Sequence, residues 1–208
     1  MDTPFTRIFE NELASRAHPG TVISLFGARR TGKTTLMKAV MSHFPASETL
    51  MVQGDDLDVS EVLSNHRISV LSNFLKGYKY LFIDEAQEIP NIGKSLKLIV
   101  DKLPDISIFI TGSSAIDLRD KVGEPLTGRG RHYYLYPFSQ GELGEDFLTS
   151  KETLEKKLIY GLYPQVYTAE TVKDKIAHLT SIKDGYLLKD ILMLANQKDT
   201  LFILNLLR

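Results

Sequence analysis

Residues 27–34 of the chain read GARRTGKT and match the pattern G-x-x-x-x-G-K-[ST]. The octapeptide follows the apolar run TVISLF (21–26) and precedes a segment, about 32–43, for which the sequence predicts a helix. Its glycines let the backbone curl so that successive N–H groups point at phosphate oxygens, and the helix amino terminus adds a positive dipole end. The octapeptide therefore predicts a phosphate-binding loop between a strand and a helix.

The side chains of this loop have predicted roles. Lys33 is expected to reach the β- and γ-phosphates of a nucleotide, and the Thr34 hydroxyl is expected to ligate Mg²⁺. The alternative, a glycine-rich turn with an exposed lysine, is disfavoured because the strand-loop-helix context is the one that phosphate binding requires. The residues predicted to contact the nucleotide are Gly27, Ala28, Arg29, Arg30, Thr31, Gly32, Lys33, Thr34 and Thr35.

A second polar group follows another apolar run, in KYLFIDEAQ (79–87). Asp84 and Glu85 come at the carboxyl end of this predicted strand, the edge where open α/β sheets bind ligands. We expect Asp84 to complete the Mg²⁺ site that Thr34 begins, and Glu85 to orient and deprotonate an attacking water. Alone, such a pair is more often a helix cap or a loop. A glutamate after the metal aspartate favours hydrolysis over transfer to a small-molecule acceptor.

Two further segments offer polar groups. ISIFITGSSA (106–115) ends a predicted strand with Thr111 and Ser113, whose hydroxyls could contact the γ-phosphate or the lytic water, or could simply cap a helix. Arg129 precedes the predicted strand 132–136. An arginine near the γ-phosphate, from this chain or a neighbouring subunit, would offset negative charge in the transition state. The alternative is a solvated basic turn or an ion-pair partner for Asp or Glu.

Strands and helices alternate over the first two thirds of the chain, which predicts a parallel three-layer α/β sheet with right-handed crossovers. We expect a core over 1–138 and a helical, lid-like segment over 139–208. The apolar run 201–207 reaches the end of the sequence, from which we expect the natural protein to continue. The predicted strands are 21–26, 49–53, 79–83, 106–110 and 132–136, and the predicted helices are 4–17, 32–43, 59–75, 91–103, 151–160 and 170–194.

Composition narrows the class of protein. The 208 residues are 43% hydrophobic and 25% charged, as in globular proteins. With 25 basic and 26 acidic residues, bulk charge does not favour non-specific nucleic-acid binding. The absence of cysteine excludes disulfides, zinc-thiolate sites and a cysteine nucleophile. No apolar run is long enough to predict a membrane-spanning helix, and the first residues do not resemble a secretory signal, so we expect a cytoplasmic protein without a membrane partner.

Several segments together resemble the prokaryotic AAA-type ATPases of the AAA-14 type, within the additional-strand, catalytic-glutamate branch of the P-loop ATPases. The segments are GARRTGKTTL, LFIDEAQEI, IFITGSSA, LTGR, LYPFSQGEL, GLYPQV and YLLKDIL. The resemblance implies a sheet of order 5-1-4-3-2 with ATP and Mg²⁺ as ligands. It implies Lys33 and Thr34 on phosphates and metal, Asp84 on the metal and Glu85 as base. It also implies Thr111 or Ser113 as polar sensor and Arg129 at the family's glycine–arginine position.

The predicted function is therefore Mg-dependent ATP hydrolysis that moves the helical segment or a further C-terminal domain. An alternative is a slowly hydrolysing, nucleotide-gated switch that recruits a partner. The absence of arginine between 139 and 207 favours the switch, because the helical segment then offers no sensor arginine except Arg208. A small-molecule kinase is a third reading, against which Glu85 argues. A protein or nucleic-acid partner would bind through the further C-terminal part, and the chain could act as an oligomer.

Overall fold

The computed structural model describes residues 5–112 and 128–187 of the chain. The chain divides into two compact units. One comprises Met1–Ala28 and Gly32–Tyr136, and the other comprises Pro137–Arg208 with the three loop residues Arg29–Thr31. Some sequence predictions lie outside the described residues: the first residue of the helix expected at 4–17, the hydroxyl of Ser113, the end of the helix expected at 170–194, the apolar segment 201–207 and Arg208.

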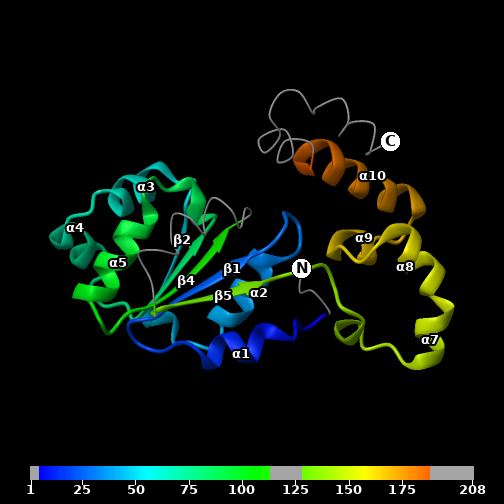
Figure 1. Ribbon diagram of the computed structural model, residues 1–208, viewed down its shortest axis with the longest axis horizontal. Helices are drawn as coiled ribbons and strands as arrows, with labels where there is room; N and C mark the ends of the chain where they lie inside the picture. The colour runs from blue at the N-terminus through cyan, green and yellow to red at the C-terminus, as the bar shows by residue number, and fades with distance from the viewer. Residues whose placement is uncertain (1–4, 113–127, 188–208) are drawn as a thin grey trace. The chain divides into compact units, whose positions relative to one another are not determined.

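Five parallel strands form one sheet in the first unit (Figure 1). Their spatial order is β2-β3-β4-β1-β5, which is the predicted order 5-1-4-3-2 read from the opposite edge. The predicted α/β fold is thus confirmed. Because the strands are parallel and in register, their carboxyl ends lie together at one edge of the sheet. The strands are β1 (Val22–Phe26), β2 (Thr49–Gln53), β3 (Tyr80–Asp84), β4 (Ser107–Gly112) and β5 (Gly130–Tyr134).

Helices cover both faces of the sheet (Figure 1). One face carries α1 (Phe9–Ser15) and α2 (Lys33–Met41), and the other carries α3 (Leu57–Ser64), α4 (Ile68–Phe74) and α5 (Ile92–Lys102). Side chains of β1 alternate between the two layers: Leu25 packs in the cluster of α1 and α2, whereas Phe26 packs in that of α3 to α5. This burial on both faces is why the strand reads as a continuous apolar run.

The helix predicted over 59–75 is in fact two helices, α3 and α4. His66 between them has a left-handed backbone (φ 55°), which a continuous α-helix does not accommodate. Its ring Nδ1 lies 2.8 Å from the hydroxyl of Ser95 on α5, and that hydroxyl also donates to the carbonyl of Leu63. The break therefore accompanies a tertiary polar contact that apolar periodicity does not reveal.

The fifth strand lies at 130–134 rather than at the predicted 132–136. Among the described strands, β5 lies at the edge of the sheet and pairs with β1, and Gly130 lies opposite Val22. Its first side chains, Arg131 and His132, are exposed. The two residues that the prediction missed, Gly130 and Arg131, have no apolar side chain.

The described residues from Pro137 onward form short helices. The helix predicted at 151–160 is divided at Thr153, whose hydroxyl donates 2.8 Å to the carbonyl of Thr149. No helix in the described parts of the chain is both long and apolar enough to cross a membrane. The helical elements are η3 (Gln140–Leu143), α7 (Phe147–Glu152), α8 (Leu154–Tyr160), α9 (Pro164–Thr168), α10 (Val172–Ile182) and the π-helical η4 (Lys183–Leu187).

Candidate functional site

The phosphate loop connects the end of β1 to the start of α2, as predicted. Two of its residues have left-handed backbones: Gly32, which precedes α2 (φ 95°), and Arg30 (φ 64°). The curl is easy for glycine and rare for arginine. Lys33 begins α2 with its side chain 5% exposed, and its Nζ donates to the carbonyls of Gly27 and Ala28, both at 3.0 Å. A fixed ammonium group beside a helix amino terminus favours an anion.

A hydrogen-bonded chain joins α2 to the ends of two strands. The hydroxyl of Thr34 donates 2.7 Å to Oδ2 of Asp84, and the hydroxyl of Thr111 donates to Oδ1 of the same carboxylate. Asp84 ends β3 and is 3% exposed, and Thr111 on β4 is fully buried. The sheet order explains the arrangement, because β3 and β4 are neighbours.

The predicted metal-binding pair, Thr34 and Asp84, is thus brought into direct contact. A hydroxyl and a carboxylate fit Mg²⁺, which takes few protein oxygens and fills its remaining positions with water and phosphate. Within the described ranges, no group of three or more His, Asp or Glu side chains offers a competing metal site.

Glu85 follows Asp84 in a left-handed conformation (φ 50°), at the start of η2 (Ala86–Glu88). Such a backbone costs a non-glycine residue about 1–2 kcal/mol, and residues of this kind cluster at functional sites. Its N–H donates 3.0 Å to the hydroxyl of Thr111, and its carboxylate accepts a hydrogen bond from the side-chain amide of Gln87. The backbone of the predicted base is therefore tied to Thr111, and its carboxylate is held by Gln87.

Thr111 lies where the sequence predicts a polar sensor, but its described contacts are those of a positioning residue. Its single hydroxyl donates to Asp84 and accepts from the N–H of Glu85. It thereby fixes the spacing of the two acidic residues. Contact of this hydroxyl, or of Ser113, with the γ-phosphate stays a prediction.

Two residues that support the site were missed at the sequence level. Gln87 lies in the quoted acidic segment without an assigned role. Gly54 follows β2, and its N–H donates 2.7 Å to the carbonyl of Asp84. A Cβ on Gly54 would lie 2.3 Å from the carbonyl oxygen of Glu85, so only glycine fits this close approach. The DEAQ spacing could have suggested Gln87, whereas nothing in the sequence marks Gly54.

Arg129 lies away from these residues. It precedes β5, and its carbonyl accepts a hydrogen bond from the N–H of Val22, at the amino-terminal end of β1. The phosphate loop begins at the other end of that five-residue strand, roughly 15 Å away. The guanidinium forms an ion pair with Asp101. Within its own chain, Arg129 is thus not brought together with the other predicted site residues. A role toward a neighbouring subunit stays a prediction.

The chain is similar to known proteins in sequence and in fold. A family model described as an AAA domain, AAA_14, matches residues 19–144. No curated protein sequence matches the chain. A Walker-type ATPase of Pyrococcus abyssi has a TM-score of 0.56 and 16% identity, over 89% of this chain and 73% of that chain. Domain III of the replication initiation protein DnaA from Thermotoga maritima has a TM-score of 0.50 and 16% identity, over 84% of this chain and 90% of that chain.

A lower TM-score of 0.44 relates the chain to AMPPCP-bound DnaA from Aquifex aeolicus, of which it spans 59% at 16% identity. At 16% identity, the two likenesses with TM-scores of 0.56 and 0.50 establish the fold alone. The family model goes further, because residues 19–144 include the phosphate loop, Asp84 and Glu85 at the end of β3, and all five strands of the sheet. The chain therefore belongs to the AAA_14 family of AAA domains and is an AAA-type ATPase domain.

Proposed function

We propose that this chain binds ATP with Mg²⁺ at the carboxyl edge of the sheet and hydrolyses the nucleotide there. The observation that carries the proposal is the carboxylate of Asp84, which accepts hydrogen bonds from both Thr34 and Thr111. This arrangement joins the phosphate loop to the predicted base through Thr111. A phosphate loop that only capped a helix would not need a buried carboxylate beside it.

Each residue has one part in the proposed reaction. Lys33 stabilises the charge of the β- and γ-phosphates, and Thr34 and Asp84 hold Mg²⁺. The bound metal would neutralise negative charge that develops on the transferred phosphoryl group. The carboxylate of Glu85 accepts a proton from a water that attacks the γ-phosphorus, and the bond to the β–γ bridging oxygen breaks to release ADP.

The consequence of hydrolysis lies in the second unit. We propose that loss of the γ-phosphate changes the position of the helical segment 139–208, or of a partner bound through it. Switch segments commonly respond to this phosphate because it holds them in place.

A slowly hydrolysing switch is the second candidate, and one contact favours it. The amide of Gln87 donates to the carboxylate of Glu85, and an oxygen that accepts this hydrogen bond is less available to accept one from an attacking water. The sequence also has no arginine between 139 and 207 that could assist from the helical segment.

The test is calorimetric titration of ATP and Mg²⁺ into the parent and Lys33→Ala chains, with phosphate release followed in parallel. Lys38→Ala is the matched control, because Lys38 lies exposed on the same helix. Binding that is lost only in Lys33→Ala, with measurable release by the parent, supports the ATPase. Binding with release below about one per hour supports the switch, since enzymes usually turn over 1–10³ times per second. If Lys33→Ala and Lys38→Ala bind ATP and Mg²⁺ equally well, the proposed nucleotide site is contradicted.

A further inference from the structure

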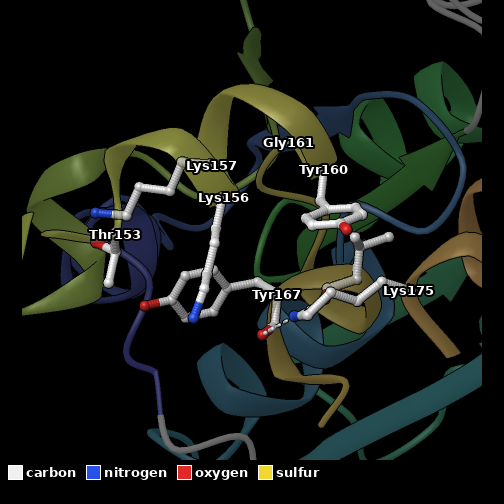
Figure 2. Close-up of a pocket in the computed structure, with 8 residues that line it drawn as sticks. Thr153, Lys156, Lys157, Tyr160, Gly161, Tyr167 and Lys175 are labelled. Carbon is white, nitrogen blue, oxygen red and sulfur yellow. Dashed lines mark hydrogen bonds between the residues drawn. The ribbon is translucent and has the colours of Figure 1, made fainter. Parts of the chain in front are cut away.

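A cavity of about 240 Å³ lies within the second unit, among α8, α9 and α10 (Figure 2). Its volume corresponds to roughly eight water molecules, below the roughly 300–1,000 Å³ of pockets for drug-sized ligands. The cavity therefore suits a compact group. The side chains that decide its chemistry are Lys156, Tyr160, Tyr167 and Lys175.

One wall is fixed by a buried ion pair. Lys157 and Glu145 form a salt bridge in which both side chains are 8% exposed. The hydroxyl of Tyr167 donates 2.7 Å to the other oxygen of Glu145. The hydrogen bond from Lys157 lowers the pKa of Glu145 to about 2, so the carboxylate stays charged and cancels the charge of Lys157. The positive charge of Lys157 is thus neutralised, and the ring of Tyr167 is held in place.

Two other ammonium groups have no carboxylate partner among the described residues. Lys175 Nζ donates to the carbonyls of Val166, at 2.9 Å, and Tyr167, at 3.3 Å, which are neutral groups. Lys156 is exposed, and among the described residues neither it nor Lys175 forms an ion pair with a carboxylate. Figure 2 shows these two lysines extending from different helices toward Tyr167, whereas Lys157 is turned toward Thr153.

We propose that this cavity binds a small organic phosphate, with the phosphate held by Lys156 and Lys175 and an apolar or aromatic part against Tyr160 and Tyr167. Two ammonium groups without carboxylate partners favour a dianion. Two aromatic rings and the buried Val166 favour an apolar body. A concave site of this size excludes a flat polymer surface. The lining residues all belong to the second unit, whereas Asp84 belongs to the first.

The experiment titrates phenyl phosphate into the full 208-residue chain carrying Lys33→Ala, which weakens phosphate binding at the nucleotide loop. The ring NMR resonances of Tyr160 and Tyr167 report binding at the cavity itself. We expect saturable shifts of both rings, with a dissociation constant below about 1 mM. Lys156→Ala should weaken binding about tenfold, and because Lys156 is exposed the variant should fold like the parent.

Lys173→Ala is the matched control, since Lys173 is exposed on α10 and does not line the cavity. The proposal is overturned if neither ring shifts at about 10 mM phenyl phosphate. It is also overturned if Lys173→Ala weakens binding as much as Lys156→Ala, which would indicate diffuse attraction. If benzyl alcohol bound as tightly as phenyl phosphate, the pocket would be purely apolar and the role of the lysines would be contradicted. If inorganic phosphate bound as tightly as phenyl phosphate, the role of the aromatic rings would be contradicted.

Discussion

Thr34 donates a hydrogen bond of 2.7 Å to Oδ2 of Asp84, although fifty residues separate them in the chain. The bond links the first turn of α2 to the end of β3. Two sequence motifs that are each local thereby become one site. The residues around this bond give the following expectations.

Replacement of Thr111 by valine removes the hydroxyl shared by Asp84 and the N–H of Glu85. Both partners then lose a hydrogen bond in a buried position. We therefore expect the free energy of unfolding to fall by about 1–3 kcal/mol and the rate of phosphate release to fall about tenfold. Urea unfolding and steady-state phosphate release measure the two effects. Thr111→Ser keeps the hydroxyl and should stay close to the parent. Parent-like turnover by Thr111→Val would show that the hydroxyl does not position the acidic residues.

Gly54→Ala places a Cβ 2.3 Å from the carbonyl oxygen of Glu85, which is backbone and has little room to move. We expect a loss of about 1–3 kcal/mol in unfolding free energy and a larger proportional loss of phosphate release, because the displaced residue is the base. Gly185→Ala is the control, since no neighbouring atom lies within 4 Å of its Cβ position. Similar thermal midpoints for both variants would contradict the close approach.

The two motifs could be predicted because their chemistry depends on short spacings. Lys33 and Thr34 follow from the phosphate-loop pattern, and Asp84 and Glu85 follow from an apolar strand that ends in acidic residues. Gly54 could not be predicted, because its role depends on how closely β2 approaches the end of β3.

Other differences also have physical causes. His66 breaks a predicted helix through a contact with Ser95 on another helix, which sequence periodicity cannot show. Arg129 is predicted to lie near the γ-phosphate or in a basic turn, and the structure places it directly before a strand. In a parallel sheet, residues before a strand lie at the edge opposite the ligand site.

The Glu145–Lys157 pair should make stability depend on pH. The folded pKa of Glu145, about 2, lies below its ordinary value of 4.5, chiefly because Lys157 donates to the carboxylate. The contribution of the Glu145 carboxylate to the stability of the fold is therefore fully present above about pH 4.5, and it is lost as the pH falls toward 2. When the pH is lowered from about 6 to 3, we expect the unfolding free energy of the parent to fall on the order of 1–3 kcal/mol more than that of Glu145→Gln. Urea unfolding at each pH measures the two free energies. If the parent and Glu145→Gln showed the same dependence on pH, the stabilising role of the pair would be contradicted.

A role of Arg129 toward a neighbouring subunit can be tested by mixing variants. Its ion pair with Asp101 is half-exposed, so Arg129→Ala should change stability by only about 0–1 kcal/mol. If subunits share sites, Arg129→Ala and Lys33→Ala chains should each release little phosphate alone. Their mixture should recover activity, because a Lys33-containing site then meets an intact Arg129. A mixture no more active than the sum of its parts would exclude this role.

The most direct measurement of the proposed mechanism compares ATP binding and phosphate release by the parent and by Glu85→Gln. The change keeps the shape of the side chain and removes its basicity, while Thr34, Asp84 and Lys33 are untouched. We predict parent-like affinity for ATP and Mg²⁺ with phosphate release reduced at least about a hundredfold, the lower end for a general base. Phosphate release equal to the parent's, with the same affinity, would contradict the assignment of Glu85 as the base.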